Sequence, residues 1–294
     1  MNWLFDPGLI SLIQQALSPA FDWLFIFFTL LGEDIFYIGL IAVIYWCLHK
    51  KAGVIVAYLM LFGFYVNYFF KMLFNMSRPD PAYRIIDKND ISHGFPSGHA
   101  QSAATFWAWA ALKTRHKALY IISPLLIFLI SFSRLYLGVH YLGDIIAGVI
   151  IGLVFTLTAY ASYPHIEKFL GRHSERLRQL VVPVIALVLF AVSLLVFPDT
   201  TRDDPATVCG GLFGFSTGLA FESRYVDFST DKIDNGTRIV RLLIGLLVIG
   251  VVYVGLSLLL SSANVFTEFA KYAIITYAAA FIVPLIFKRV EKKE

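Results

Sequence analysis

The sequence predicts an all-α fold, a polytopic bundle of about nine transmembrane helices. Hydrophobic residues make up 58% of the 294 positions and charged residues 15%, and the mean hydropathy is +0.72. A soluble domain carries about 25% charged residues, so a chain this apolar belongs in a bilayer. The same composition excludes a disordered chain, and the absence of a Gly-x-y period excludes a collagen-like fibre. The two cysteines are too few for a disulfide framework.

Apolar runs of about 20 residues define the predicted spans, because that length crosses the hydrocarbon core. The runs are 33–49, 53–74, 97–113, 118–133, 141–161, 179–197, 206–222, 238–261 and 266–287. The Gly-rich run 206–222 is the weakest. Its small residues favour close helix packing, and it is our candidate contact in a homo-oligomer. Residues 1–32 are interrupted by two prolines and two aspartates, so we expect two short interfacial helices there, with Trp3 and Trp23 as headgroup-level anchors.

Lys and Arg residues divide unequally between the two sides of this topology. Seventeen of the 24 fall on one side, which the positive-inside rule assigns to the cytoplasm, together with the C-terminus. The extracytoplasmic side of a plasma (inner) membrane then receives the other seven: Lys71, Arg78, Arg84, Lys88, Arg134, Arg202 and Lys271. Cytoplasmic loop charges explain the basic pI of about 8.9, so we expect no nucleic-acid partner.

Three segments on the sparsely charged side carry residues suited to chemistry. The first ends a span with Lys71 and Arg78, which are two helical turns apart and share one face, and Pro79 stops the helix just beyond them. Two cations on one face can bind an anion. The alternative for this segment alone is a pair of side chains that snorkel at a membrane boundary.

The second segment is Gly94-Phe95-Pro96-Ser97-Gly98-His99, directly before an apolar run. Backbone N–H groups at a helix start, together with the helix dipole, favour a negatively charged group, so Ser97 and Gly98 form a candidate phosphate site. His99 in the first turn can donate or accept a proton. The alternative is a serine N-cap followed by an incidental histidine.

The third segment contains Ser133-Arg134, His140 and Asp144. Because His140 and Asp144 are four residues apart at the start of a span, the carboxylate can reach the imidazole and leave its other nitrogen free as a nucleophile or base. Arg134 supplies a planar donor fork for phosphate oxygens. The alternative is a structural His–Asp pair inside the bundle.

Together these residues suit phosphoryl transfer through a covalent phosphohistidine. Cations outnumber carboxylates at the site, which disfavours a metal centre, and we expect no cofactor. Two other classes remain open. One is a transporter or flippase that binds phosphorylated lipid without turnover, although binding alone needs neither histidine. In the other, residues 179–294 make the protein chiefly an assembly module.

In order and spacing, the three motifs resemble the signature of the type 2 phosphatidic acid phosphatase superfamily, over residues 53–161. The resemblance implies that His140 attacks phosphorus, Asp144 holds its ring, and His99 protonates the leaving group and later activates water. It implies a metal-independent membrane phosphatase that acts on a lipid phosphate monoester or diphosphate, phosphatidate-like or undecaprenyl diphosphate-like. The phosphoryl oxygens would be bound by Lys71, Arg78, Ser97, Gly98 and Arg134.

The resemblance also suggests a division of the chain. We expect interfacial helices over 1–32, a six-helix-type phosphatase core over 33–161, a basic cytoplasmic loop over 162–178, and a C-terminal helical extension over 179–294. The loop 80–93, just before the second motif, supplies Arg84 and His93 as candidates for a headgroup pocket. A solvated loop is the alternative for its other charged residues.

Overall fold

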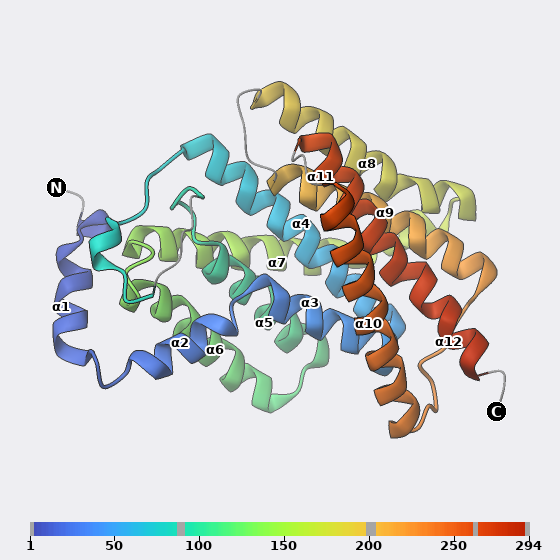
Figure 1. The fold of residues 1–294 in the computed structure, drawn as a ribbon, viewed down its shortest axis with the longest axis horizontal. Helices are drawn as coiled ribbons and strands as arrows, with labels where there is room; N and C mark the ends of the chain where they lie inside the picture. The colour runs from blue at the N-terminus through green and yellow to red at the C-terminus, as the bar shows by residue number, and fades with distance from the viewer. Residues whose placement is uncertain (1–2, 87–91, 198–203, 261–263, 292–294) are drawn as a thin grey trace. The chain divides into compact units, whose positions relative to one another are not determined.

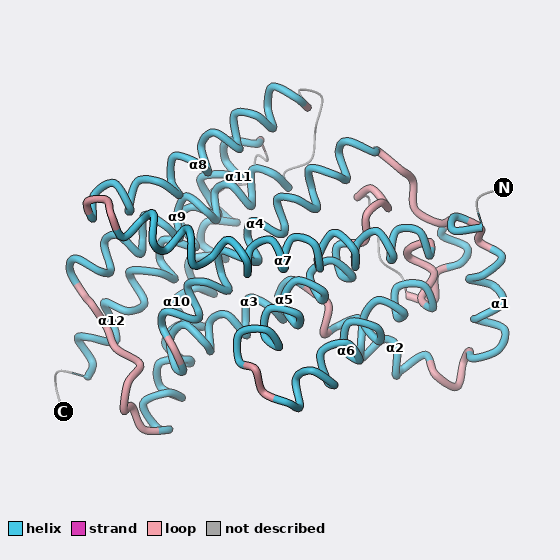
Figure 2. Tube along the Cα trace, turned by 180° about the vertical axis from the view of Figure 1, so that it is seen from behind, coloured by secondary structure: helices cyan, strands magenta, loops and turns pink. Residues whose placement is uncertain are grey.

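The computed structural model describes residues 3–86, 92–197, 204–260 and 264–291, and these residues form helices and loops with no strand among them (Figure 2). The predicted all-α fold is therefore confirmed. Lys88 and Arg202 lie outside the described residues. The chain divides into two compact units, one of Met1–Ile38 with Val66–Pro164 and the other of Gly39–Tyr65 with His165–Glu294.

The helices of the first unit come from two separate stretches of the chain (Figure 1). They are α1 (Gly8–Leu17), α2 (Asp22–Leu30), the start of α3 (Asp34–Val43), the end of α4 (Lys50–Phe74), α5 (Gly98–Thr114), α6 (Lys117–Tyr136) and most of α7 (Leu142–Gly171), with single 3₁₀ turns η1 at Trp3–Phe5 and η3 at Pro81–Tyr83. The pair α1 and α2 bends by 119°, at the break that Pro19 makes in the sequence.

Two glycines set how closely α7 approaches α5. A Cβ on Gly148 would come within 2.5 Å of the carbonyl oxygen of Ser97, and one on Gly152 within 2.5 Å of that of Gln101. Thr156 continues the same face and donates to the carbonyl of Thr105 at 3.2 Å. Small residues one turn apart let two backbones pack closely, so this contact fixes the start of α5 against α7.

The two N-terminal helices belong to the core of the first unit. Ile10 on α1 is fully buried in a cluster with Ala100, Leu135 and Ile145, and α2 packs against α6. Trp3 and Trp23 are 65% and 70% exposed, so their rings remain available to a membrane interface. The short helices expected over residues 1–32 are present, and they also cover the loop that leads into α7.

The second unit contains the start of α4 and the C-terminal helices. Its other elements are η2 (Ile44–Leu48), α8 (Glu175–Val196), α9 (Asp204–Tyr225), α10 (Asn235–Leu259), α11 (Val265–Tyr277), η4 (Ala278–Ile282) and α12 (Val283–Glu291), and η2 and η4 are single π-helical turns. Tyr45 and Trp46 of η2 donate to the carbonyls of Ala280 and Ala279 in η4 at 3.0 and 3.1 Å. The two irregular turns therefore support each other.

The Gly-rich helix α9 packs against α11 within the same chain. Side chains added at Gly210 and Gly214 would overlap the carbonyl oxygens of Phe269 and Ala273, and one at Gly218 would come within 2.7 Å of Ala280. The small-residue face that we considered for a homo-oligomer is thus occupied inside the chain. A homo-oligomer stays a prediction, but this face does not supply its contact.

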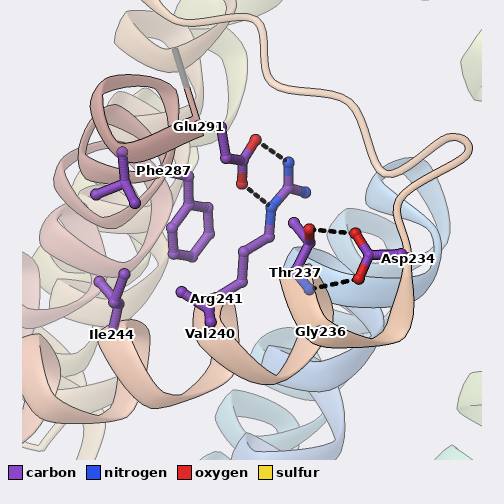
Figure 3. A pocket seen from close by; sticks show the side chains of 9 residues that line it. Asp234, Gly236, Thr237, Val240, Arg241, Ile244, Phe287 and Glu291 are labelled. Carbon is purple, nitrogen blue, oxygen red and sulfur yellow. Dashed lines mark hydrogen bonds and ion pairs between the residues drawn. The ribbon is translucent and has the colours of Figure 1, made fainter. Parts of the chain in front are cut away.

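Buried charges in the second unit are paired with opposite charges. Lys50 contacts the buried carboxylate of Glu222 at 2.8 Å, and Arg241 binds Glu291 through two hydrogen bonds of 2.6 and 2.8 Å. Figure 3 shows the second pair lining a pocket of about 240 Å³ between α10 and α12, next to Phe287. Because both charged groups already bind each other, this pocket is not a candidate catalytic site.

Six helical segments in the described part of the chain are long and apolar enough to cross a membrane, or seven if the bent pair α1 and α2 counts as one. The count of nine spans is not confirmed. The segment Asp34–Leu48 is shorter than the others, and neither α5 nor α9 is among the six. Both α5 and α9 are largely buried, so they need less apolar surface than a lipid-facing helix.

The basic loop expected over 162–178 is mostly helical. Helix α7 extends to Gly171 and α8 begins at Glu175, where Ser174 accepts a hydrogen bond from the backbone N–H of Leu177. The interruption is therefore limited to residues 172–174. Polar composition alone indicated a loop, but most of these residues belong to the end of α7 and the start of α8.

Candidate active site

The three predicted motifs meet at one end of the first unit. Helices α4 and α6 end there with Lys71 and Arg134, while α5 and α7 begin there with His99 and Asp144. The backbone N–H of Ser97 donates to the carbonyl of Asp144 at 3.0 Å, which joins the second motif directly to the third. Because these helix ends gather at one end of the unit, segments distant in sequence come together.

His140 and Asp144 form the pair that their spacing predicts. Nδ1 of His140 lies 3.2 Å from Oδ2 of Asp144, which also accepts from the backbone N–H of Tyr141 at 2.9 Å. Both side chains are buried. On the other side of the ring, Nη1 of Arg78 lies 3.0 Å from Nε2. Since arginine only donates, this contact assigns the proton to Nδ1 and the lone pair to Nε2.

The surroundings of His140 keep its ring neutral. Burial lowers the pKa of His140 well below its ordinary value, and the nearby positive charges of Arg78, Arg134 and Lys71 lower it further. A cationic ring is costly in a buried and positively charged site. The imidazole therefore retains its lone pair at neutral pH.

Four hydrogen bonds to residues that the structure describes hold Arg78 in place. Besides the contact with His140, its Nη1 donates to the carbonyl of Val139 at 3.1 Å, and Nε and Nη2 donate to the carbonyl and hydroxyl oxygens of Ser92 at 2.8 and 2.7 Å. The sequence did not identify Ser92. A serine in a polar loop carries no distinguishing signal, and only the fold brings it to the guanidinium.

Lys71 and Arg134 are also held by neutral oxygens. Lys71 donates to the backbone carbonyl of His93, and Nη1 of Arg134 donates to the hydroxyl of Thr29 at 2.5 Å. Both cations are buried, with exposures of 5% and 1%. Two buried cations held at fixed positions suit a site for an anion.

The start of α5 has the form of an anion site. Ser97 is fully buried, and its hydroxyl has no hydrogen-bond partner in the structure. A Cβ on Gly98 would come within 3.3 Å of Oδ1 of Asn67. The Asn67 amide donates to the carbonyl of Pro96 at 3.4 Å and to Gln101 at 2.9 Å. Asn67, a lone amide in an apolar run, is a further residue that sequence reasoning missed.

His99 faces the turn that connects α2 to α3. Its Nε2 lies 3.4 Å from Oε1 of Glu33, and the two side chains are 16% and 27% exposed. A Cβ on Gly32 would come within 2.7 Å of Cδ2 of the His99 ring. No motif indicated either residue, because Gly32 ends the segment expected to lie at the membrane interface and Glu33 begins the first predicted span.

The two candidates for a headgroup pocket have different surroundings. His93 meets the site through its carbonyl, which accepts from Lys71. Arg84 follows the turn η3 and is half-buried, and the next residue, Ile85, donates its N–H to the carbonyl of Leu137 at 3.2 Å. Arg84 therefore lies on a segment paired with the loop that carries His140. A role in headgroup binding stays a prediction for both side chains.

Within the ranges that the structure describes, no group of three His, Cys, Asp or Glu side chains is placed to hold a metal ion. Cys47 and Cys209 are both buried and free. Metal independence stays a prediction about the reaction.

Comparison with known families finds two matches along the chain. The PAP2 superfamily model matches residues 52–168, and a model described as PAP2 superfamily phosphatase, transmembrane extension, matches residues 206–294. The second match covers much of the extension in which the sequence showed no motif. Residues 1–51, which include the turn that faces His99, lie outside both matches.

Individual proteins with similar sequences include mouse sphingosine-1-phosphate phosphatase 2, which is 25% identical over 67% of this chain and 58% of that protein. Phosphatidylglycerophosphatase B of Bacillus subtilis is 32% identical over 31% of this chain and 48% of that protein. The chain thus spans about half the length of these relatives. A crystal structure of a Bacillus subtilis transmembrane PAP2-type phosphatidylglycerolphosphate phosphatase aligns with a TM-score of 0.46 and 26% identity, covering 55% of this chain and 86% of that chain.

Proposed function

This chain belongs to the PAP2 superfamily, and we propose that it is a multi-pass membrane phosphatase that hydrolyses a lipid phosphate monoester or diphosphate through a phosphohistidine intermediate, without a metal ion. The observation that carries this proposal is the orientation of His140, whose Nδ1 lies 3.2 Å from Asp144 and whose Nε2 faces Arg78. A buried imidazole held in this tautomer is suited to nucleophilic attack.

In the first step, Nε2 of His140 forms a bond to phosphorus while the bond to the leaving oxygen breaks. Asp144 stabilises the positive charge that develops on the ring and keeps Nδ1 protonated. His99, across the site, gives a proton to the departing alkoxide or phosphate. The products of this step are the lipid alcohol, or the lipid monophosphate from a diphosphate, and phosphohistidine.

Negative charge on the three phosphoryl oxygens is stabilised by the groups around His140. Arg78 and Arg134 supply donors at fixed positions, Lys71 adds a third positive charge, and Ser97 and the N–H of Gly98 add the start of α5. The buried Ser97 hydroxyl without a partner supports this assignment, because a phosphoryl oxygen would satisfy it.

In the second step, water attacks phosphorus and the bond between nitrogen and phosphorus breaks. His99, which lost its proton in the first step, accepts a proton from the attacking water. Inorganic phosphate then leaves and both histidines return to their starting states. No metal enters this cycle, since three cations already stabilise the charge that a metal ion would otherwise neutralise.

The distribution of charge supports an extracytoplasmic site. Lys113 and Arg115 end α5, and Lys117 begins α6, at the opposite end of these helices from His99 and Arg134. The positive-inside rule assigns the lysine-rich end to the cytoplasm of a plasma (inner) membrane. On this assignment the site opens at the outer boundary, where an amphiphile can present its phosphate while its tails stay in hydrocarbon.

Release of inorganic phosphate from lipid substrates tests the proposal. The similar proteins are named for sphingosine 1-phosphate and phosphatidylglycerophosphate, so a substrate panel should contain these two lipids, phosphatidate and undecaprenyl diphosphate. We expect His140→Ala to lose at least about a thousandfold in turnover, and His116→Ala, at an exposed position, to remain active.

Two results would overturn parts of this account. Release by His140→Ala within about tenfold of the wild-type rate, from every lipid that the wild type hydrolyses, would contradict the role of His140 as nucleophile. Loss of wild-type activity in EDTA, with recovery on addition of a divalent metal, would contradict metal independence while leaving the phosphatase assignment in place.

A further inference from the structure

The end of α2 and the turn before α3 contact two residues of the proposed reaction. One of them binds the phosphoryl group and the other transfers protons. Thr29, near the end of α2, accepts from Arg134 at 2.5 Å, and Glu33 lies 3.4 Å from Nε2 of His99. These residues lie 105 positions and 66 positions from their partners. They also lie outside the residues matched by the PAP2 superfamily model.

The backbone of this turn is shaped to approach the His99 ring. A Cβ on Gly32 would come within 2.7 Å of Cδ2 of His99 and within 2.7 Å of Cγ2 of Ile130, so no larger residue fits without moving the ring. The turn is itself closed by hydrogen bonds from the N–H of Gly32 to the carbonyl of Thr29 and from the N–H of Glu33 to that of Leu30, at 3.0 and 3.3 Å. The carboxylate is therefore presented by a defined turn.

The proton balance of the reaction gives this carboxylate a purpose. His99 must be cationic to protonate the leaving oxygen, but Arg78, Arg134 and Lys71 make the site positive, as their effect on His140 shows. Positive neighbours disfavour a cationic imidazole, and a carboxylate within 4 Å favours it. The carboxylate of Glu33 therefore favours the cationic form of His99, whereas burial and the three cations keep His140 neutral beside Asp144.

We propose that Glu33 is a positioning residue that orients His99 and stabilises its protonated form, and that Gly32 provides the space for this contact. The inference rests on the proposed function, because it concerns the acid of that reaction. Glu33 acts through His99 and takes no part in bond formation. The N-terminal helices are on this view part of the catalytic unit.

Leaving-group dependence separates this role from a structural one. Glu33→Gln keeps the shape of the side chain and removes its charge. For the best lipid phosphate of the panel, whose alkoxide needs a proton, we expect kcat/KM to fall about tenfold to a hundredfold, within the range that general acids contribute. For p-nitrophenyl phosphate, whose phenolate leaves without a proton, we expect less than about a threefold fall. The parameter kcat/KM is chosen because it reports phosphoryl transfer to His140 and not the later hydrolysis.

Asp34→Asn is the matched control, since it removes the same charge from the adjacent, exposed residue and should leave both kcat/KM values unchanged. In a His99→Ala background, Glu33→Gln should cause no further loss, because the group through which it acts is absent. The thermal unfolding temperature of each variant in detergent shows whether the fold is retained.

Three outcomes would overturn the proposal. Equal losses for the lipid and aryl substrates would indicate a general structural effect. An undiminished loss in the His99→Ala background would show that Glu33 acts elsewhere, and a loss confined to lipids with an amino group near the phosphate would assign Glu33 to headgroup recognition. If the wild type releases phosphate from no substrate, the proposed function fails; if the wild type is active and Glu33→Gln equals it on the lipid, only this inference fails.

Discussion

Arg134 in the first unit and Arg241 in the second are both almost fully buried, and among the described contacts the first donates to a hydroxyl and the second to a carboxylate. Arg241 binds the carboxylate of Glu291 through two hydrogen bonds and also donates to the carbonyls of Trp46 and Ser229. Arg134 donates to the neutral hydroxyl of Thr29. A carboxylate partner cancels the charge of the cation, whereas a hydroxyl only fixes its position.

The same contrast extends to the other buried charges of the two units. Glu222 is closed off by Lys50 and by the N–H of Phe228, while Lys71 donates to a backbone carbonyl. At His140, burial and the surrounding positive charge lower the pKa of the imidazole. Burial of charge alone therefore does not identify a functional site in this protein; the gathering of Arg78, Arg134 and Lys71 around His140 does.

The largest expected effect on turnover comes from removing the charge of Asp144, the carboxylate that orients His140. Asp144→Asn keeps the side-chain shape but can donate to Nδ1 of His140, which favours the wrong tautomer. We expect kcat to fall about 10³- to 10⁴-fold, as for the equivalent change in a Ser-His-Asp triad, with little change in thermal stability. Phosphate release and thermal unfolding of the same preparation test this, and activity within tenfold of the wild type would contradict the orienting role.

The matching change in the second unit should have the opposite outcome. Glu222→Gln removes the buried carboxylate that lies 2.8 Å from Lys50 and accepts from the N–H of Phe228, while Asp227 remains 3.3 Å from Lys50. We expect a clearly lower unfolding temperature, while turnover per folded molecule stays within about twofold of the wild type. Glu175→Gln, at an exposed position, is the control for loss of one carboxylate. A large drop in turnover without loss of stability would break the comparison between the units.

The same substitution, glycine to alanine, can be made at a close helix contact in each of the two units. Gly148→Ala places a methyl group 2.5 Å from the carbonyl of Ser97, and Gly214→Ala places one on the carbonyl of Ala273; overpacking of this kind costs about 1–3 kcal/mol. We expect both to lower the unfolding temperature, but only Gly148→Ala to lower kcat/KM, because it displaces the start of α5. Gly250→Ala on α10, where a Cβ meets nothing within 4 Å, should change neither quantity.

The smallest expected effect concerns pH. A histidine with the ordinary pKa of about 6.5 would lose about fourfold of its neutral form between pH 7.5 and 6.0. The pKa of His140 is lowered well below this value. We therefore expect kcat/KM, calculated with the concentration of the dianionic form of the substrate, not to fall over this interval and to decline only at lower pH. The linked stability follows the same sign: the unfolded chain binds the proton first, so stability falls as pH drops below about 6.5. A fourfold fall centred near pH 6.5 would show that the positive surroundings do not act on the nucleophile.

Local sequence patterns predicted the parts of the fold and of the site that depend on local geometry. The spacing of His140 and Asp144 predicted their contact, and the position of Ser97 predicted the start of α5. The presence of helices followed from the apolar runs. The limits of the spans did not, since buried helices such as α5 need not be as apolar as a lipid-facing helix. The helical stretch over 162–178 was not predicted either.

Residues that act across the fold were not predictable in this way. Thr29 and Glu33 contact residues far along the chain, and Asn67 and Ser92 are single polar residues with no repeating pattern around them. The small residues of α9 predicted close helix packing but did not identify the partner helix, because the pattern is the same for an intramolecular and an intermolecular contact. Each of these needed the tertiary structure.

The most direct test of the central claim is to trap the intermediate. The wild-type protein, incubated briefly with a ³²P-labelled lipid phosphate that it hydrolyses and denatured in alkali, should carry one acid-labile, alkali-stable phosphate on the peptide that contains His140. Asp144→Asn should carry less label, and His140→Ala none. Label on another residue, or phosphate release at the wild-type rate without any labelled protein, would contradict a phosphohistidine at His140.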